Sequence, residues 1–186
     1  GETIIIAGLL SAGKRRDISK FPLLWRIPYI GEKFFIHTDE IITKTDLIGL
    51  QPRGIRLAHR LQAKLSELLN DTQIRCGELD VTFHRDDLRM RDKPIAPQQN
   101  KMEFIVDGRN VVLVDDVFFT GRTIRAGLDA LLTYGRPDKV ELAILIDRRF
   151  SRELPIEPTY IGKQIDSIVD QHVVVEWKEE NGIDRV

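Results

Sequence analysis

Two adjacent carboxylates, Asp115 and Asp116, follow a short apolar run and precede a turn that carries hydroxyl groups. The run, from Val111 to Val114, has the composition of a buried parallel strand. Ligands of open parallel sheets collect at the carboxyl ends of the strands, so the residues after Val114 should line a site. Carboxylates at that edge can accept hydrogen bonds from vicinal hydroxyls, such as those of a ribose.

The turn from Thr120 to Thr123 opens a segment with helical periodicity. It supplies two hydroxyls and several backbone N–H groups at a helix N-terminus, where the partial positive charge favours a phosphate. This order predicts a grip for a phosphorylated ribose; the plainer alternative is a purely structural strand-turn-helix unit. The predicted ribose-phosphate site comprises Asp115, Asp116, Val117, Phe119, Thr120, Gly121, Arg122 and Thr123.

The stretch LVDDVFFTGRT, from Leu113 to Thr123, resembles the signature of type I phosphoribosyltransferases. It is most similar to the PyrR family, whose members are pyrimidine operon attenuators and uracil phosphoribosyltransferases. The resemblance covers about residues 46–184 and includes the segment from Ser151 to Ile156, SRELPI. One departure lies just before Arg152. The family's R-G-H is replaced here by the four residues from Arg148 to Ser151, RRFS, which lack the histidine and are one residue longer.

The resemblance implies an α/β chain with the type I phosphoribosyltransferase fold, a mainly parallel central sheet flanked by helices, and a flexible loop or hairpin. It also implies that uracil and phosphoribosyl pyrophosphate are converted into UMP and pyrophosphate. Positive charge builds on the ribose ring as pyrophosphate leaves, so electrostatic stabilisation and water exclusion matter more than a nucleophile. Substrate-bound Mg²⁺ would neutralise the pyrophosphate. The implied catalytic residues are Asp115, Asp116 and Arg85.

A second turn, from Gln51 to Gly54, occupies the place where this family binds pyrophosphate. Arg53 can fork onto a phosphate, and Gly54 allows close backbone approach. Arg85 and Asp86 match the family's R-D-D at the base of its flexible loop. The predicted pyrophosphate-binding residues are Gln51, Pro52, Arg53, Gly54, Arg85 and Asp86.

Asp147 and Arg148 follow the predicted strand Val140–Ile146 and are candidates for base binding, with Arg148 addressing a carbonyl of uracil. Phe118 and Phe119 are expected to belong to the core rather than to wall a base pocket. Regulation through pyrimidine-operon leader RNA is the second activity that the resemblance implies. The candidate RNA contacts are Arg56, His59, Arg60, Lys64 and Arg152. The plainer alternative for the helical residues among them is an exposed, solvated face.

Composition is that of one globular domain spanning residues 1–186: 42% of residues are hydrophobic and 31% charged. The net charge of −1 gives no overall basic field that would point to nucleic acid. The single cysteine, Cys76, excludes an intrachain disulfide and fits a reducing cytoplasm. No apolar run approaches the ~20 residues that cross a bilayer. The resemblance implies a homodimer or homotetramer.

The predicted elements are strands at 47–50, 79–84, 111–114, 140–146 and 173–177 and helices at 55–69 and 124–132. Residues 1–45 show no clear pattern, and a polar stretch at about 85–104 predicts the flexible loop. Residues 8–14 match the start of a P-loop, but Arg15 replaces the hydroxyl that would hold magnesium, which disfavours a nucleotide triphosphatase. No metal ligand is assigned, because the histidines lack metal-ligand spacing.

Two rival functions stay open on the sequence. One is an RNA-binding attenuator with vestigial catalysis, which keeps the ribose-phosphate grip only to sense a nucleotide. The other is a phosphoribosyltransferase for a purine base, because base recognition uses few groups and leaves little trace in a sequence.

Overall fold

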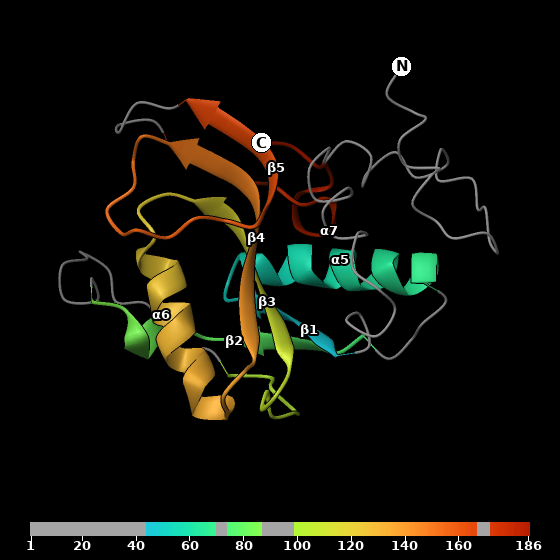
Figure 1. The fold of residues 1–186 in the computed structure, drawn as a ribbon. Coiled ribbons are helices and arrows are strands. Elements are labelled where there is room, and N and C mark those ends of the chain that lie inside the picture. Colours follow the sequence, from blue (N-terminus) through green and yellow to red (C-terminus); the bar gives the residue numbers. More distant parts are fainter. Residues whose placement is uncertain (1–43, 70–73, 87–98, 167–171) are drawn as a thin grey trace, which may run out of the picture.

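Five parallel strands form one sheet in the computed structural model, which describes residues 44–69, 74–86, 99–166 and 172–186 (Figure 1). The strand order is β2-β1-β3-β4-β5, and every neighbouring pair is parallel. The strands are β1 Thr45–Leu50, β2 Cys76–Leu79, β3 Asn110–Phe118, β4 Lys139–Arg149 and β5 Tyr160–Asp166. This confirms the predicted α/β class with a parallel sheet.

Two helices connect strands of the sheet and cover its opposite faces. Helix α5, Gly54–Leu69, joins β1 to β2, and helix α6, Arg122–Leu131, follows β3. The remaining helical elements are short: the 3-10 turns η2, Thr82–His84, and η4, Leu132–Tyr134, and helix α7, Lys178–Asn181. Figure 1 shows α7 close to α5, far from α6.

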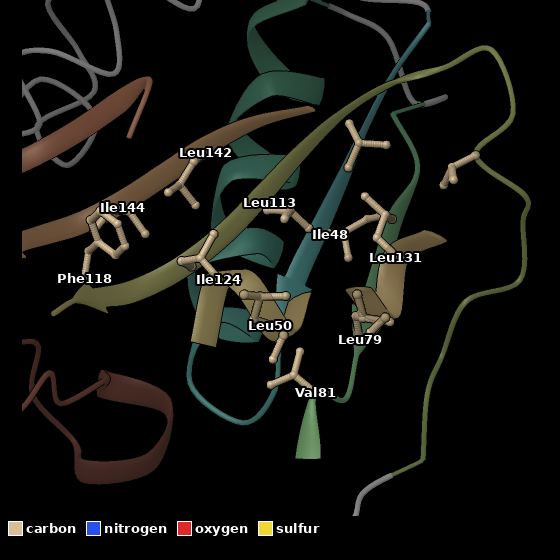
Figure 2. Packing of buried hydrophobic residues seen from close by; sticks show 14 residues of the cluster. Ile48, Leu50, Leu79, Val81, Leu113, Phe118, Ile124, Leu131, Leu142 and Ile144 are labelled. Atoms are coloured by element: carbon tan, nitrogen blue, oxygen red, sulfur yellow. The ribbon is translucent and has the colours of Figure 1, made fainter. Parts of the chain in front are cut away.

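The core consists of one apolar cluster on each face of the sheet. Val111 and Leu113 pack with α6 residues such as Ile124, whereas Val112 and Val114 pack on the α5 face. This alternation is what a strand between two covered faces requires. Figure 2 shows the α6-side cluster, with its side chains on the opposite side of the strands from α5.

Several predicted strand boundaries are wrong. Strand β3 runs to Phe118, so the acidic pair lies inside the strand and not after it. The strand predicted at 79–84 ends at Leu79, and residues 82–84 form η2 instead. The Asp80 carboxylate causes this change, because it accepts the Thr82 backbone N–H at 2.9 Å and the Thr82 hydroxyl at 2.6 Å.

The chain after β4 also departs from the prediction. No strand forms at the described residues 172–177, where Glu176 makes an isolated bridge with Arg185 and Trp177 is buried beside α5. The strand in this part of the chain is β5, which was not predicted. The P-loop-like segment lies outside the described residues, as does the 87–98 part of the predicted flexible loop. Among the residues described, no helix combines the length and apolar character needed to cross a membrane.

An ion triad of Asp46, Arg75 and Arg109 lies at the end of the sheet where β1 begins. Asp46 is fully buried and accepts two hydrogen bonds from Arg75, at 2.7 and 2.5 Å, and two from Arg109, at 3.0 and 2.8 Å. Burial alone raises the pKa of Asp46, but the bonds from both guanidinium groups outweigh it and leave the pKa below its ordinary value. The triad ties β1 to the segments that precede β2 and β3.

Candidate active site

The carboxylates of Asp115 and Asp116 lie near the carboxyl end of β3 and are 7% and 3% exposed. One oxygen of each is bound locally: Asp115 Oδ1 accepts the Asp116 N–H at 2.9 Å, and Asp116 Oδ1 accepts the Val117 N–H at 2.7 Å. Asp116 Oδ2 is buried and has no hydrogen-bond partner. The pair therefore presents acceptor capacity that the described protein leaves unused.

Burial and mutual repulsion make it unfavourable for both carboxylates to be ionised. Burial, and then the charge of Asp116, raise the pKa of Asp115 well above its ordinary value, while Arg85 acts in the opposite direction. Burial also raises the pKa of Asp116, against the Val117 N–H and the charge of Arg53. A ligand that donates hydrogen bonds or brings positive charge would stabilise both ionised carboxylates.

The predicted phosphate turn forms where β3 gives way to α6. Gly121 is the N-cap residue of α6 and has φ of +95°, a conformation that favours glycine. Gly121 has no side chain to cap the helix, and the Arg122 N–H donates to the Thr120 hydroxyl only at the long distance of 3.4 Å, so the N-terminal backbone N–H groups can serve an anion. The turn is held from outside, since the Thr120 carbonyl accepts the N–H groups of Glu153 and Leu154 at 3.0 and 3.2 Å.

Arg85 reaches this turn, because its Nη1 donates to Thr123 Oγ1 at 2.9 Å. Asp86 contacts the same part of the chain through other residues: it pairs with Arg122 of the turn at 2.8 Å and with Arg125 of α6 at 2.9 Å, both of which have exposed side chains. These contacts tie the segment after η2 to α6. They give Asp86 a structural role, and its predicted contact with pyrophosphate stays a prediction.

The turn from Gln51 to Gly54 lies beside the acidic pair, since a Cβ on Gly54 would lie 3.0 Å from the Cα of Asp115. Gln51 is 6% exposed, whereas Pro52 and Arg53 are exposed, and the peptide between Gln51 and Pro52 is cis. A Cβ on Gly54 would lie 2.2 Å from the Val114 carbonyl oxygen. The close approach of α5 to β3 thus requires glycine at this position, and the predicted approach of the turn to a ligand stays a prediction.

The candidate base-binding pair is buried, and Asp147 is already engaged. Asp147 binds the guanidinium of Arg152 and accepts the Gln164 side-chain amide at 3.2 Å. Arg148 is 5% exposed and its guanidinium lies 4.0 Å from the centre of the Phe119 ring. Arg148 therefore remains a base-binding candidate, beside the end of β3, while Asp147 serves the loop that follows.

Arg152, predicted to contact RNA, is turned into the protein. It donates to the Phe119 carbonyl at 2.5 Å and lies 3.5 Å from the centre of the Phe118 ring, in addition to its pair with Asp147. Phe118 itself is 2% exposed and belongs to the α6-side core, as predicted. These contacts hold the β4–β5 connection against the phosphate turn. The Arg152 side chain keeps 25% of its exposure, so its predicted contact with RNA stays a prediction.

The four basic residues predicted on α5 are each paired with a carboxylate. Arg56 binds Glu180 at 2.8 Å, and Arg60 binds Glu179 at 2.5 Å and Asp184 at 2.7 Å. The other two pairs are Lys64 with Glu67 at 2.7 Å and His59 with Glu78 at 3.3 Å. The C-terminal segment therefore neutralises much of the basic face that the sequence suggested for RNA.

No cluster of three or more His, Cys, Asp or Glu side chains able to hold a metal occurs in the described part of the chain. The site nevertheless offers two buried oxygens without partners, Asp116 Oδ2 and Gln51 Oε1. Both are acceptors, so they fit a cation that arrives with its own water and substrate ligands. Glu78, which binds the Gln51 amide at 3.4 Å, was missed by the sequence analysis because a glutamate in a short strand resembles a surface residue.

The class of protein follows from this fold and site together with one family comparison. Residues 34–180 match the model of the phosphoribosyl transferase domain. Two solved structures share the fold. The first is a hypoxanthine-guanine phosphoribosyltransferase from Bacillus anthracis, with TM-score 0.54 and 14% identity. The match covers 76% of this chain and 78% of the Bacillus chain. The second is a purine phosphoribosyltransferase from Pyrococcus horikoshii, with TM-score 0.51 and 20% identity. The match covers 82% of this chain and 92% of the Pyrococcus chain. The chain is a phosphoribosyltransferase of type I fold.

Curated relatives narrow the class further. The chain is 44% identical to the bifunctional protein PyrR of Halalkalibacterium halodurans over 142 residues, which are 75% of this chain and 78% of the relative. It is 48% identical to the PyrR of Deinococcus deserti over 141 residues, 75% of each. The chain belongs to the PyrR family.

Proposed function

We propose that this chain is a cytoplasmic uracil phosphoribosyltransferase that forms UMP and pyrophosphate from uracil and phosphoribosyl pyrophosphate. The bond from the anomeric carbon to pyrophosphate breaks, and its electron pair leaves with the pyrophosphate. N1 of uracil forms the new bond to that carbon and loses its proton. The observation that carries the proposal is the buried acidic pair, with an unpartnered oxygen, between the α6 turn and the Arg53 turn.

The residues of the chain have complementary parts in this reaction. Asp115 and Asp116 accept hydrogen bonds from the ribose hydroxyls and stabilise positive charge that develops on the ring. The α6 turn receives the 5-phosphate through its N–H groups and the hydroxyls of Thr120 and Thr123. Arg53 and Arg85, which also holds Thr123 of the α6 turn, would stabilise the negative charge of the departing pyrophosphate, and substrate-bound Mg²⁺ would neutralise more of it. Arg148, whose guanidinium stacks on Phe119, would contact a carbonyl of the base.

Product binding tests the proposed base and phosphate together. In calorimetric titrations, we expect UMP to bind and uridine to bind at least about tenfold more weakly, because uridine lacks the anion for the α6 turn. IMP should bind more weakly than UMP, because its purine is larger and offers a different hydrogen-bonding edge. Preference for IMP would support a purine substrate instead. Equal binding of UMP and uridine would contradict the assignment of the phosphate turn.

A second function, regulation through pyrimidine-operon leader RNA, is supported by membership of a family whose curated relatives are named bifunctional. On α5, RNA phosphates would have to replace Glu179, Glu180 and Asp184 as partners of Arg56 and Arg60. We therefore expect RNA affinity to rise in an E179Q/E180Q/D184N variant. Filter binding at several salt concentrations measures the affinity. A plot of the logarithm of the binding constant against the logarithm of the salt concentration should have a slope of about −0.7 for each phosphate contacted on a single strand.

A charge-matched control separates this local effect from net charge. The E103Q/D138N/E157Q variant removes the same number of negative charges at exposed positions away from α5. An equal rise in affinity in both variants would show a general charge effect, and no rise in either would contradict RNA binding on α5.

The implied homodimer or homotetramer stays a prediction, which sedimentation velocity can check.

A further inference from the structure

The side-chain amide of Gln51 has an orientation fixed by its neighbours. Its Nε2 lies 3.0 Å from the carbonyl oxygen of Gln99 and 3.4 Å from a carboxylate oxygen of Glu78. Both neighbours are acceptors, so the amide nitrogen must face them and the amide oxygen must point elsewhere. Chemistry alone therefore assigns the two ends of this amide.

The residues that orient Gln51 are themselves held in place. Glu78 is 12% exposed at its side chain and pairs with His59 at 3.3 Å and with Lys101 at 3.1 Å. Its backbone exchanges two hydrogen bonds with Lys101, at 3.1 and 3.0 Å. The carboxylate cannot easily swing away, so Gln51 is set by a shell of fixed partners.

The free end of this amide is a buried acceptor at the site. Gln51 Oε1 and Asp116 Oδ2 are the two buried side-chain atoms without a partner in the described residues. The last paired residues of β1 and β3 are Gly49 and Val114. Gln51 comes two positions after Gly49, and Asp116 comes two positions after Val114. Gln51 lies in the turn directly after β1 and Asp116 near the end of the neighbouring β3, and buried acceptors there call for a partner that brings protons or positive charge.

Pyrophosphate alone does not meet that demand, because its ionised oxygens are acceptors as well. The water shell of a magnesium ion does, because metal-bound water is a strong donor and Mg²⁺ keeps several of its waters. We propose that Gln51 Oε1 accepts a hydrogen bond from a water of the cation that accompanies pyrophosphate. Gln51 then acts as a specificity residue, which makes the turn bind hydrated magnesium pyrophosphate in preference to the free anion.

This inference rests on the proposed function, and pyrophosphate binding tests the two separately. Titrations with sodium pyrophosphate are made with Mg²⁺ and with EDTA, for the wild type and for Gln51→Met, which keeps the length and removes the acceptor. We expect Gln51→Met to weaken binding about tenfold with Mg²⁺ and less than about twofold with EDTA, the usual size of one charge-assisted hydrogen bond. Arg53→Ala should weaken binding in both conditions, because Arg53 addresses the anion.

A second substitution also loses the amide nitrogen that bonds Gln99 and Glu78, but it changes the acceptor in the opposite direction. Gln51→Glu keeps an acceptor and adds negative charge, so the ratio of affinities with and without Mg²⁺ should rise, whereas Gln51→Met should lower it. Equal losses in both conditions, or no loss with Mg²⁺, would overturn the role of Gln51. Wild-type protein that binds pyrophosphate in neither condition would overturn the proposed function itself. Melting temperatures of all variants verify folding.

Discussion

Replacing both Asp115 and Asp116 by asparagine should lower kcat for pyrophosphate release by at least about 10²-fold. The size follows from mutations of groups that stabilise charge in a transition state, which typically cost 10²–10³-fold. Asparagine keeps the size and the ability to accept a hydrogen bond, so the loss reports the missing negative charge opposite the ribose ring. Unchanged kcat in a folded variant would contradict the role of the pair.

Stability should move in the opposite direction in the same variant, which separates a catalytic role from a structural one. Burial and mutual repulsion raise the pKa of Asp115, so its ionised form is disfavoured in the folded chain. The folded state therefore holds a proton that the unfolded chain loses near pH 3.9, and wild-type stability falls as pH rises from there through the raised pKa. The asparagine variant lacks this fall and should melt no lower than the wild type at neutral pH.

Asp46→Asn should be the most destabilising single substitution of a polar residue outside the site. It removes the fully buried charge that pairs with Arg75 and Arg109 and leaves both guanidinium groups without their carboxylate partner. Removal of one member of a buried ion cluster commonly costs 3–5 kcal/mol, and we expect about 3 kcal/mol because both arginines are partly exposed. Urea denaturation at pH 7 measures the free energy of unfolding.

Asp166→Asn provides a matched control, because Asp166 makes the same two-bond pair with Arg149, at 2.7 and 2.9 Å, on the surface. Its loss should be much smaller, since water screens the pair. The lowered pKa of Asp46 also sets the pH dependence: its stabilisation is full above about pH 3.9 and is lost as pH falls through the lowered pKa. Equal losses for the two substitutions would refute the importance of burial.

The part of the fold that carries the phosphate turn could be predicted because its local signals agree. A β-branched run, glycine at a left-handed position and helical periodicity after Thr123 all favour the same strand-turn-helix unit. Strand β5 escaped prediction because it pairs only with β4 and carries exposed polar residues such as Lys163 and Gln164. Its apolar pattern is therefore weak.

Long-range pairing explains the errors in the site. The basic face of α5 can be read from the sequence, but the carboxylate partners of Arg56 and Arg60 lie more than 100 positions away, at separations of 124 from Arg56 to Glu180 and 119 from Arg60 to Glu179. Arg152 likewise looked like a surface arginine until the fold placed it on Asp147 and Phe118. Local pattern predicts which residues line the carboxyl edge of the sheet, but not which of them are already paired within the protein.

Release of pyrophosphate from phosphoribosyl pyrophosphate, with Mg²⁺ and with uracil, orotate, hypoxanthine or guanine in separate reactions, tests the central claim most directly. We predict release with uracil and none above background with the other three bases. The Asp115→Asn/Asp116→Asn variant serves as the matched blank. Release with a purine alone, or no release with any base from folded protein that binds UMP, would contradict a uracil phosphoribosyltransferase.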